Sequence, residues 1–255
     1  MSRLPDPSAA DLAPPRGSVP TYADEDTTRA VRRAGQVAGV ALLLIAGLAG
    51  FGALFAIDGV VTPGNAARTA GDLTSSEGTF RLGVVSLYAI IVLDIVAAWA
   101  LFRFFAPVDS WVSRLTAWFR VAFAAVFLVA IAQLAGVPKL LNDDAYRGVF
   151  GDEQVEALAL LRIESYYDIW MAGLFLFGVH LVGVGYLAYR SGYVPRVIGV
   201  LLVVAGLGYA FDTVSSVLSE TPIVVSTVTF FGEFALAVWL VVRSGRVQPG
   251  TNRER

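Results

Sequence analysis

The most prominent pattern along the chain is a series of long apolar stretches, each about as long as a lipid bilayer is thick. From Ala34 to Ile57 there is no charged residue. At a rise of about 1.5 Å per residue, this stretch can cross a hydrocarbon core of about 30 Å. Five more stretches of this kind follow, each interrupted by one or two charged residues: Phe80–Phe102, Trp111–Val137, Tyr166–Tyr189, Val197–Ser219 and Pro222–Val242. The pattern predicts an all-α polytopic membrane protein, a six-transmembrane-helix bundle.

The predicted domain organisation is one membrane domain between two tails. Residues 1–28 are rich in Pro, Ser, Ala and Asp and offer no apolar face, which favours a disordered cytoplasmic tail. The transmembrane domain covers residues 29–243, and residues 244–255 form a second cytoplasmic tail. The fourth span is expected to begin early and to project beyond the membrane, because Val155, Leu158 and Leu161 alternate with charged residues at helical spacing.

Basic residues predict which helix ends face the cytoplasm. Cytoplasmic loops of membrane proteins carry an excess of Lys and Arg. With the N-terminus inside, most arginines fall at cytoplasmic helix ends, and the opposite ends hold only Arg68, Arg81, Lys139, Arg147 and Arg162. We therefore expect an N-in/C-in topology in the cell membrane.

Composition supports the membrane assignment and excludes several kinds of site. The chain is 56% hydrophobic and 16% charged, whereas soluble domains are about 25% charged. With no cysteine, disulfides, iron–sulfur clusters and thiolate zinc sites are excluded, and the single histidine excludes a haem held by two imidazoles. We expect no metal, no cofactor and no nucleic-acid partner. The lipid bilayer is the expected environment, and a membrane protein partner or a homo-oligomer is the candidate assembly.

Four ionisable residues within the predicted spans lie at one depth. Counting about 1.5 Å per residue from the helix ends places Asp94, Arg120, His180 and Glu233 about 14–15 Å into the membrane, near its midplane. An ionisable residue at that depth needs a partner, a cavity or a function. Asp94 and Arg120 lie on adjacent antiparallel helices and are expected to form an ion pair; Glu233 and His180 could form a second pair. A packing network and a functional cavity both remain open interpretations.

Three further ionisable residues, Arg81, Asp168 and Asp212, form a predicted outer polar layer. Aromatic residues near this level, such as Tyr166 and Trp170, are typical of a membrane interface, and Arg81 can extend its charged group to water. Asp212 is predicted to lie deeper than the other two and is not explained in this way.

Glycines are concentrated in the fourth and fifth spans. Gly178, Gly185, Gly199 and Gly206 belong to this cluster, and Gly35 and Gly39 form a GxxxG pattern in the first span. Glycine lets helix backbones approach closely in lipid. We expect these residues to pack helices of one chain together, with a dimer interface as the alternative.

The turn between the fourth and fifth spans has its own signals. Gly192 can adopt the left-handed conformation that ends a helix, and Pro195 suits the start of the next helix. Arg190 and Arg196 on either side favour a cytoplasmic turn.

Specific residues also carry a resemblance to a known family. They lie mainly between Phe177 and Asp212 and include Phe177, Gly178, His180, Leu181, Gly185, Tyr186, Arg190, Ser191, Gly192, Pro195, Arg196, Gly199, Ala205, Gly206, Gly208, Tyr209 and Asp212. Phe80-Arg81-Leu82, Phe119-Arg120 and Gly232-Glu233 extend the likeness over roughly residues 30–243. In these residues the chain resembles domain-of-unknown-function family 4386, which comprises bacterial and archaeal multi-pass membrane proteins. The resemblance implies six helices and brings no known catalytic residues.

Three functions stay open from the sequence. The preferred one is a non-catalytic membrane subunit or regulator that packs through its Gly-rich helices. The alternative is a small-molecule or proton-coupled transport pathway through the midplane polar cluster. A membrane-embedded lipid-modifying enzyme that uses Glu233 or Asp212 ranks below both, because no HExxH, Walker loop or serine–histidine arrangement is present.

Overall fold

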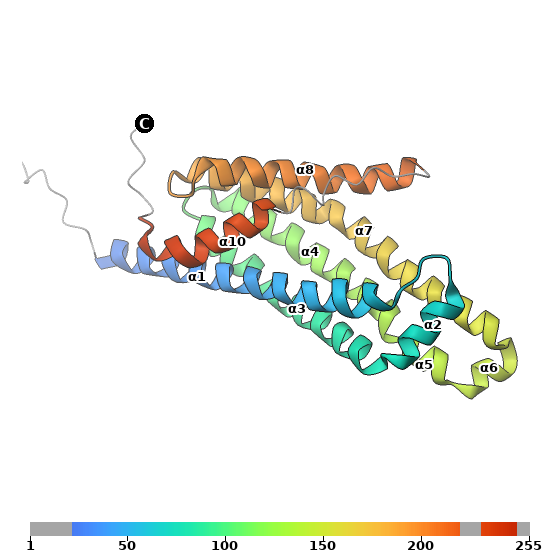
Figure 1. The fold of residues 1–255 in the computed structure, drawn as a ribbon. Helices are drawn as coiled ribbons and strands as arrows, with labels where there is room; N and C mark the ends of the chain where they lie inside the picture. The colour runs from blue at the N-terminus through green and yellow to red at the C-terminus, as the bar shows by residue number, and fades with distance from the viewer. Residues whose placement is uncertain (1–21, 220–230, 249–255) are drawn as a thin grey trace, which may run out of the picture.

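A computed structural model describes residues 22–219 and 231–248, and within these ranges every secondary-structure element is helical (Figure 1). In chain order the elements are α1 (Tyr22–Ala49), the π-helix η2 (Gly50–Ile57), the 3₁₀ turn η3 (Asp58–Val60), α2 (Ala66–Ser75), α3 (Glu77–Phe105), α4 (Ser110–Ala135), α5 (Val137–Asn142), α6 (Asp144–Phe150), α7 (Asp152–Ser191), α8 (Arg196–Leu218), α10 (Phe231–Arg243) and the 3₁₀ turn η4 (Ser244–Arg246).

Five helical stretches among the described residues are long and apolar enough to cross a membrane. They are Glu25–Val60, Glu77–Phe105, Ser110–Asn142, Asp152–Ser191 and Arg196–Leu218. The first four contain the first four spans expected from the sequence, and the fifth matches Val197–Ser219 except for its last residue. The first half of the sixth, Pro222–Val242, lies outside the described residues, and its second half belongs to α10. The chain is therefore an all-helical, multi-pass membrane protein.

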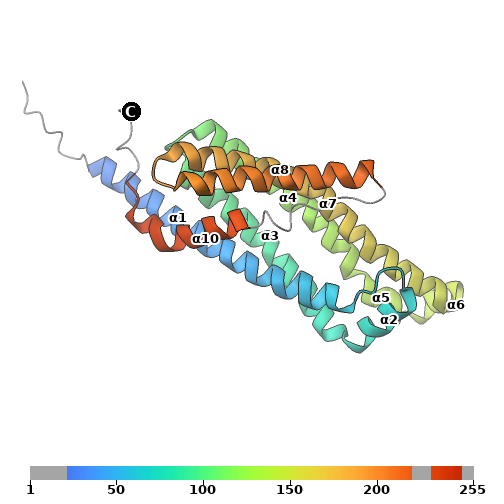
Figure 2. The same cartoon turned by 45° about the horizontal axis from the view of Figure 1, so that its top comes forward.

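The long helices form an elongated bundle in which neighbours in the sequence pack side by side. α1 packs on α3, α3 on α4, α4 on α7 and α7 on α8, while α10 lies against both α1 and α8. Short helices α2, α5 and α6 gather at one end, and the described N-terminal part of α1 lies with η4 at the other (Figures 1 and 2). The bundle thus has two distinct ends joined by long apolar helices.

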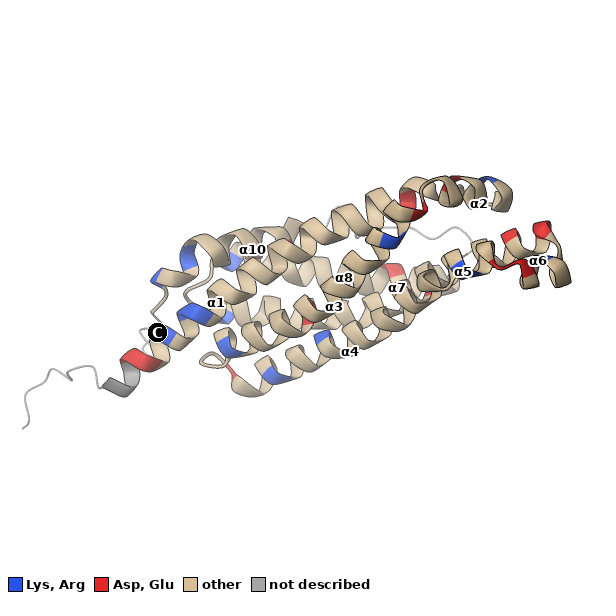
Figure 3. Cartoon of the chain, turned by 90° about the horizontal axis from the view of Figure 1, so that it is seen from below, with Lys and Arg blue, Asp and Glu red and all other residues tan. Residues whose placement is uncertain are grey.

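Charge and hydrophobicity divide the surface in the way a bilayer requires. Large apolar side chains lie exposed along the outer faces of the long helices, including Val92 at 63%, Trp99 at 58% and Trp118 at 63%. Lys and Arg lie mostly at the end that holds the start of α1, whereas acidic residues gather near α2 and α6 (Figure 3). An apolar belt between two polar ends is typical of a membrane-spanning bundle.

Glycine explains how closely α7 and α8 pack. A Cβ atom on Gly178 would lie 2.5 Å from the carbonyl oxygen of Gly206, and one on Gly185 would lie 2.6 Å from that of Gly199. A Cβ atom on Gly35 would collide with Phe104 of α3 and with Ser244 of η4. A Cβ atom on Gly39 would collide with the Val241 backbone of α10. These glycines serve packing within one chain, as the sequence indicates.

The ends of the membrane domain differ from the sequence expectation. The disordered tail predicted over residues 1–28 overlaps α1, which begins at Tyr22, so residues 22–28 are helical; residues 1–21 lie outside the described range. In this first part of α1, Arg29 contacts Glu25 at 3.3 Å and Asp26 at 3.2 Å, which are exposed ion pairs one helical turn apart. At the other end, Arg32 donates to the Val247 carbonyl oxygen at 2.8 Å, which holds the residues after α10 against α1. The start of the fourth span at Asp152 confirms its predicted extension.

The α7–α8 turn is built as its residues predict. Gly192 ends α7 with φ of 72°, and Pro195 directly precedes α8. Tyr193 fixes the turn to α3 by donating to the Phe104 carbonyl oxygen at 2.9 Å. Burial raises the pKa of Tyr193, which keeps its hydroxyl protonated as the donor.

Replacing Gly192 with alanine is expected to lower the free energy of unfolding by about 1 kcal/mol, because alanine in the left-handed region strains its backbone. The check is the thermal unfolding midpoint in detergent. Gly71→Ala is the matched control: Gly71 lies inside α2 with open space around it, so alanine there should be neutral or stabilising. Equal losses in both variants would contradict the prediction.

Candidate functional site

A buried ion pair joins α3 and α4 at the centre of the bundle. Arg120 Nη2 lies 2.6 Å from Asp94 Oδ1, and both side chains are only 2% exposed. The pair predicted from the equal depth of Asp94 and Arg120 is therefore present. Because removing both charges from water is costly, the pair needs further hydrogen bonds to be stable.

His180 on α7 supplies one of these bonds and is held in a defined tautomer. Its Nδ1 lies 2.8 Å from the Thr116 carbonyl oxygen, and its Nε2 lies 3.3 Å from Arg120 Nη1. A carbonyl oxygen only accepts and a guanidinium only donates, so Nδ1 carries the hydrogen and Nε2 accepts from Arg120. His180 is thus neutral and extends the network to a third helix. The second predicted pair, Glu233 with His180, is not formed, since both imidazole nitrogens have other partners.

The guanidinium of Arg120 still has one nitrogen that donates no hydrogen bond to a described residue. Its carbon Cζ lies 5.3 Å from the centre of the Phe177 ring, a cation–π contact. Its Nε atom is buried and has no hydrogen-bond partner among the described residues. Arg120 is therefore held by α3 and α7 and is not fully satisfied.

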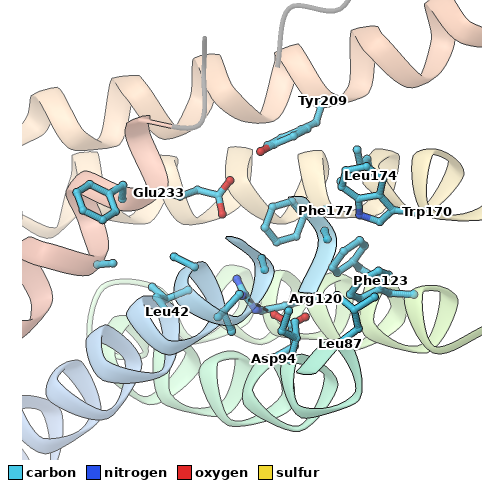
Figure 4. A pocket seen from close by; sticks show the side chains of 18 of the residues that line it. Leu42, Leu87, Asp94, Arg120, Phe123, Trp170, Leu174, Phe177, Tyr209 and Glu233 are labelled. Carbon is cyan, nitrogen blue, oxygen red and sulfur yellow. Dashed lines mark hydrogen bonds and ion pairs between the residues drawn. The ribbon is translucent and has the colours of Figure 1, made fainter. Parts of the chain in front are cut away.

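Glu233 on α10 faces the same network from the opposite side. It interacts electrostatically with both Arg120 and Asp94. Its carboxylate and the Tyr209 hydroxyl on α8 point toward each other (Figure 4). Glu233 is partly buried, whereas Asp94, Arg120 and His180 are almost fully buried. The structure therefore gathers the four residues of the predicted midplane cluster, with Glu233 as the most accessible one.

A cavity of about 190 Å³ extends from this cluster between α1, α3, α4, α7, α8 and α10. Its polar groups are few, and its walls are aliphatic and aromatic (Figure 4). The lining residues are Leu42, Ile45, Ala46, Ala49, Ala53, Leu87, Ile90, Asp94, Arg120, Phe123, Phe127, Tyr166, Trp170, Leu174, Phe177, Tyr209, Glu233, Phe234 and Ala237. Along α3, α4 and α7 they run from the charged cluster toward the end that carries α2 and α5.

One wall of the cavity has an unusual backbone. Ala53 belongs to the π-helical segment η2, which continues α1 without a break after Ala49. Such π-helical turns are rare, and those that occur are often found at functional sites. Gly52 in the same segment lies against Ser86 and Gly83 of α3, so close packing on that side leaves the Ala49–Ala53 side beside the cavity.

The predicted outer polar layer is placed in three different environments. Arg81 is 61% exposed at its side chain and pairs with Glu77 one helical turn away at 2.6 Å. Asp168 is exposed, whereas Asp212 is buried and engaged in an interaction. At this level the structure shows instead a bond from the Tyr167 hydroxyl to Asp58 Oδ1 at 2.5 Å, which ties α7 to η3. Asp58 and Tyr167 were not predicted as site residues.

The aromatic wall was also missed, although helical spacing contains the signal for it. Phe123 and Phe127 follow Arg120 by three and seven positions and so share its face of α4. Tyr166, Trp170 and Phe177 are likewise spaced along the His180 face of α7. Among the described residues, no group of three or more His, Cys, Asp or Glu side chains could hold a metal ion.

Comparison with known proteins agrees with this architecture. Residues 37–244 match the family described as Domain of unknown function (DUF4386), which covers the bundle and the charged cluster. The chain belongs to the DUF4386 family. It is similar to a protein of Archaeoglobus fulgidus, described as an uncharacterised protein, with 30% identity over 164 residues, which is 64% of this chain and 85% of the relative. No solved structure matches the chain.

Proposed function

We propose that this DUF4386 protein is a non-catalytic membrane pathway for a small, largely apolar molecule that binds in the central cavity. The single observation that carries the proposal is an apolar cavity of about 190 Å³ that ends on a cluster of charged groups. A buried apolar cavity of about 150 Å³ is large enough to bind benzene. A few polar groups at one end of an apolar cavity are typical of sites that orient a ligand.

The space beside the charged cluster differs between its two sides. Beyond Arg120, His180 and Glu233, toward the arginine-rich end, the residual space is only about 10 Å³ and is lined by Leu101, Leu202 and other apolar residues. A ligand in the cavity can therefore approach the charged cluster from one side, while the space on the other side is too small to hold it. Closure on one side is what a pathway with alternating access requires.

We place the protein in the cell membrane with six spans and both termini in the cytoplasm. The start of α1 and the turn η4 after α10 lie at one end of the bundle, since Arg32 bonds to the Val247 carbonyl oxygen. α8 runs away from that end, and α10 (Phe231–Arg243) leads back to η4 at that end, which supports a sixth crossing after α8. Basic residues concentrate at the end that holds the start of α1 (Figure 3), which supports a cytoplasmic position for it.

Filling the cavity tests the proposal. Ala46→Phe on α1 adds a phenyl group to a residue that lines the cavity, and we expect it to displace any co-purified small molecule without unfolding the bundle. The measurement is native mass spectrometry of the full chain released from mild detergent. The expected result is a bound mass on the wild type that is lost in the variant; a wild type without bound mass, or a mass retained by Ala46→Phe, would contradict the proposal.

A second candidate, a subunit of a larger membrane complex, is favoured by a separate observation. A surface groove of about 310 Å³ runs between α1 and α3, lined by Gln36, Val37, Val40, Ala41, Leu44, Leu93 and Val96. Such a groove fits the apolar face of a partner's transmembrane helix. In the same experiment, Val40→Trp should remove a co-purified protein and leave the small molecule in place, so the two variants serve as controls for each other.

A further inference from the structure

The charges around the cavity do not balance. Asp94 and Glu233 bring two carboxylates to the cluster, whereas Arg120 brings one guanidinium and His180 is neutral by its hydrogen bonds. An uncompensated negative charge inside a membrane bundle is costly. The cluster therefore lacks one positive charge, which either a proton or a cation can supply.

The groups that face Glu233 from the neighbouring elements leave room beside its carboxylate for a cation. α4 presents Arg120, which is already bonded to Asp94 of α3 and to His180 of α7. α8 presents the Tyr209 hydroxyl, with Asp212 as a further acidic residue within electrostatic reach of Tyr209. The α1 residues that line the cavity are apolar. Of the charged groups described around Glu233, acidic ones thus outnumber basic ones.

The walls of the cavity also favour a positively charged ligand. Phe123, Phe177, Trp170 and Tyr209 all line it. Aromatic faces attract cations, and a carboxylate among aromatic rings combines both attractions. An anionic ligand would meet two carboxylates and a guanidinium whose Nη atoms are already engaged.

We infer that the ligand of this cavity is a small lipophilic amine, whose ammonium group pairs with Glu233 while its apolar body lies against the aromatic walls. This inference rests on the proposed function and adds the chemical class of the ligand. The ammonium and a proton compete for one carboxylate. Binding to the protonated site follows Glu–COOH + R–NH₃⁺ → Glu–COO⁻···⁺H₃N–R + H⁺, so each molecule bound to a protonated site releases one proton.

Three probes with the same benzyl body test the inference: benzylammonium, benzyl alcohol and benzoate. Binding to the full chain in lipid nanodiscs is measured by calorimetry, with empty nanodiscs subtracted, and proton release is measured with an indicator in weak buffer. We expect the wild type to bind benzylammonium about tenfold more tightly than benzyl alcohol and to release protons only with the amine. Benzoate should bind most weakly.

Glu233→Gln should abolish the preference for benzylammonium and its proton release while leaving benzyl alcohol binding within about twofold, a small change on the affinity scale. Glu164→Gln is the matched control, since Glu164 is an exposed acid on α7 away from the cavity lining. Glu233→Asp, which keeps the charge, should retain part of the preference. If Glu233→Gln does not fold, the ranking of the three probes on the wild type still tests the amine inference.

The outcomes separate this inference from the proposed function. If benzyl alcohol or benzoate binds as tightly as benzylammonium, or Glu233→Gln keeps the preference, the amine inference fails and the pathway stands. If none of the probes binds, or Ala46→Phe binds them all as the wild type does, the cavity is not a ligand site and both fail.

Discussion

Replacing Arg120 with methionine is expected to lower the free energy of unfolding by about 3–5 kcal/mol. The substitution leaves the Asp94 carboxylate buried at 2% exposure without its cationic partner. It also removes the donor to His180 Nε2, so a second buried polar atom loses its bond. The measurement is the thermal unfolding midpoint in detergent, followed by tryptophan fluorescence and by the amount of monodisperse protein after heating.

A double variant separates the ion pair from the general effect of mutating the core. Asp94→Leu combined with Arg120→Met removes both charges and should recover most of the stability, because apolar replacement of a whole buried pair is often neutral. Arg81→Met is the matched exposed control; it breaks the Arg81–Glu77 pair at the surface and should cost less than about 1 kcal/mol. If the losses of the two single variants simply add in the double variant, Asp94 and Arg120 are not coupled.

The same double variant distinguishes the two interpretations of the cluster left open by the sequence. A purely structural network predicts that a stable double variant retains every other property. A ligand site predicts normal folding with a larger preference for benzylammonium, because the Arg120 guanidinium that faces Glu233 has been removed while the Glu233 carboxylate remains.

The depth of each residue along its helix was enough to predict the Asp94–Arg120 pair, but it did not predict which groups His180 and Glu233 face. Asp94 and Arg120 lie on adjacent antiparallel helices, so counting residues from the helix ends determines whether they meet. His180 and Glu233 share that depth, but the rotation of α7 and α10 decides which group each one faces. That rotation follows from glycine contacts such as Gly178–Gly206, which act between surfaces and are not visible in the residue count.

The cavity could not be predicted for a related reason. Its lining comes from α1, η2, α3, α4, α7, α8 and α10, and an empty volume depends on how imperfectly their surfaces fit together. The aromatic spacing on α4 and α7 is compatible with a filled core as well as with a cavity wall. Grouping Arg81, Asp168 and Asp212 into one outer layer likewise did not predict their surroundings, since Asp212 is buried whereas Arg81 and Asp168 are exposed.

Replacing Gly206 with leucine is expected to lower the free energy of unfolding by about 3 kcal/mol, the upper end of the usual range for overpacking. A side chain at Gly206 meets the backbone carbonyl oxygen of Gly178 and the Val182 backbone, neither of which can move without separating α7 from α8. Because α8 also carries Tyr209 toward Glu233 (Figure 4), the cavity should lose its shape as well. Unfolding is measured by size-exclusion chromatography after heating.

Gly47→Leu is the matched control for Gly206→Leu, since Gly47 is an exposed helical glycine of α1 with open space around it. Leucine there gains helix propensity without a collision and should be neutral or stabilising. If the glycine cluster served a dimer interface instead, Gly206→Leu would change the oligomeric state and leave the unfolding of the monomer unaffected. A lowered midpoint at unchanged oligomeric state therefore assigns Gly206 to the α7–α8 contact, on which the position of Tyr209 beside the cavity depends.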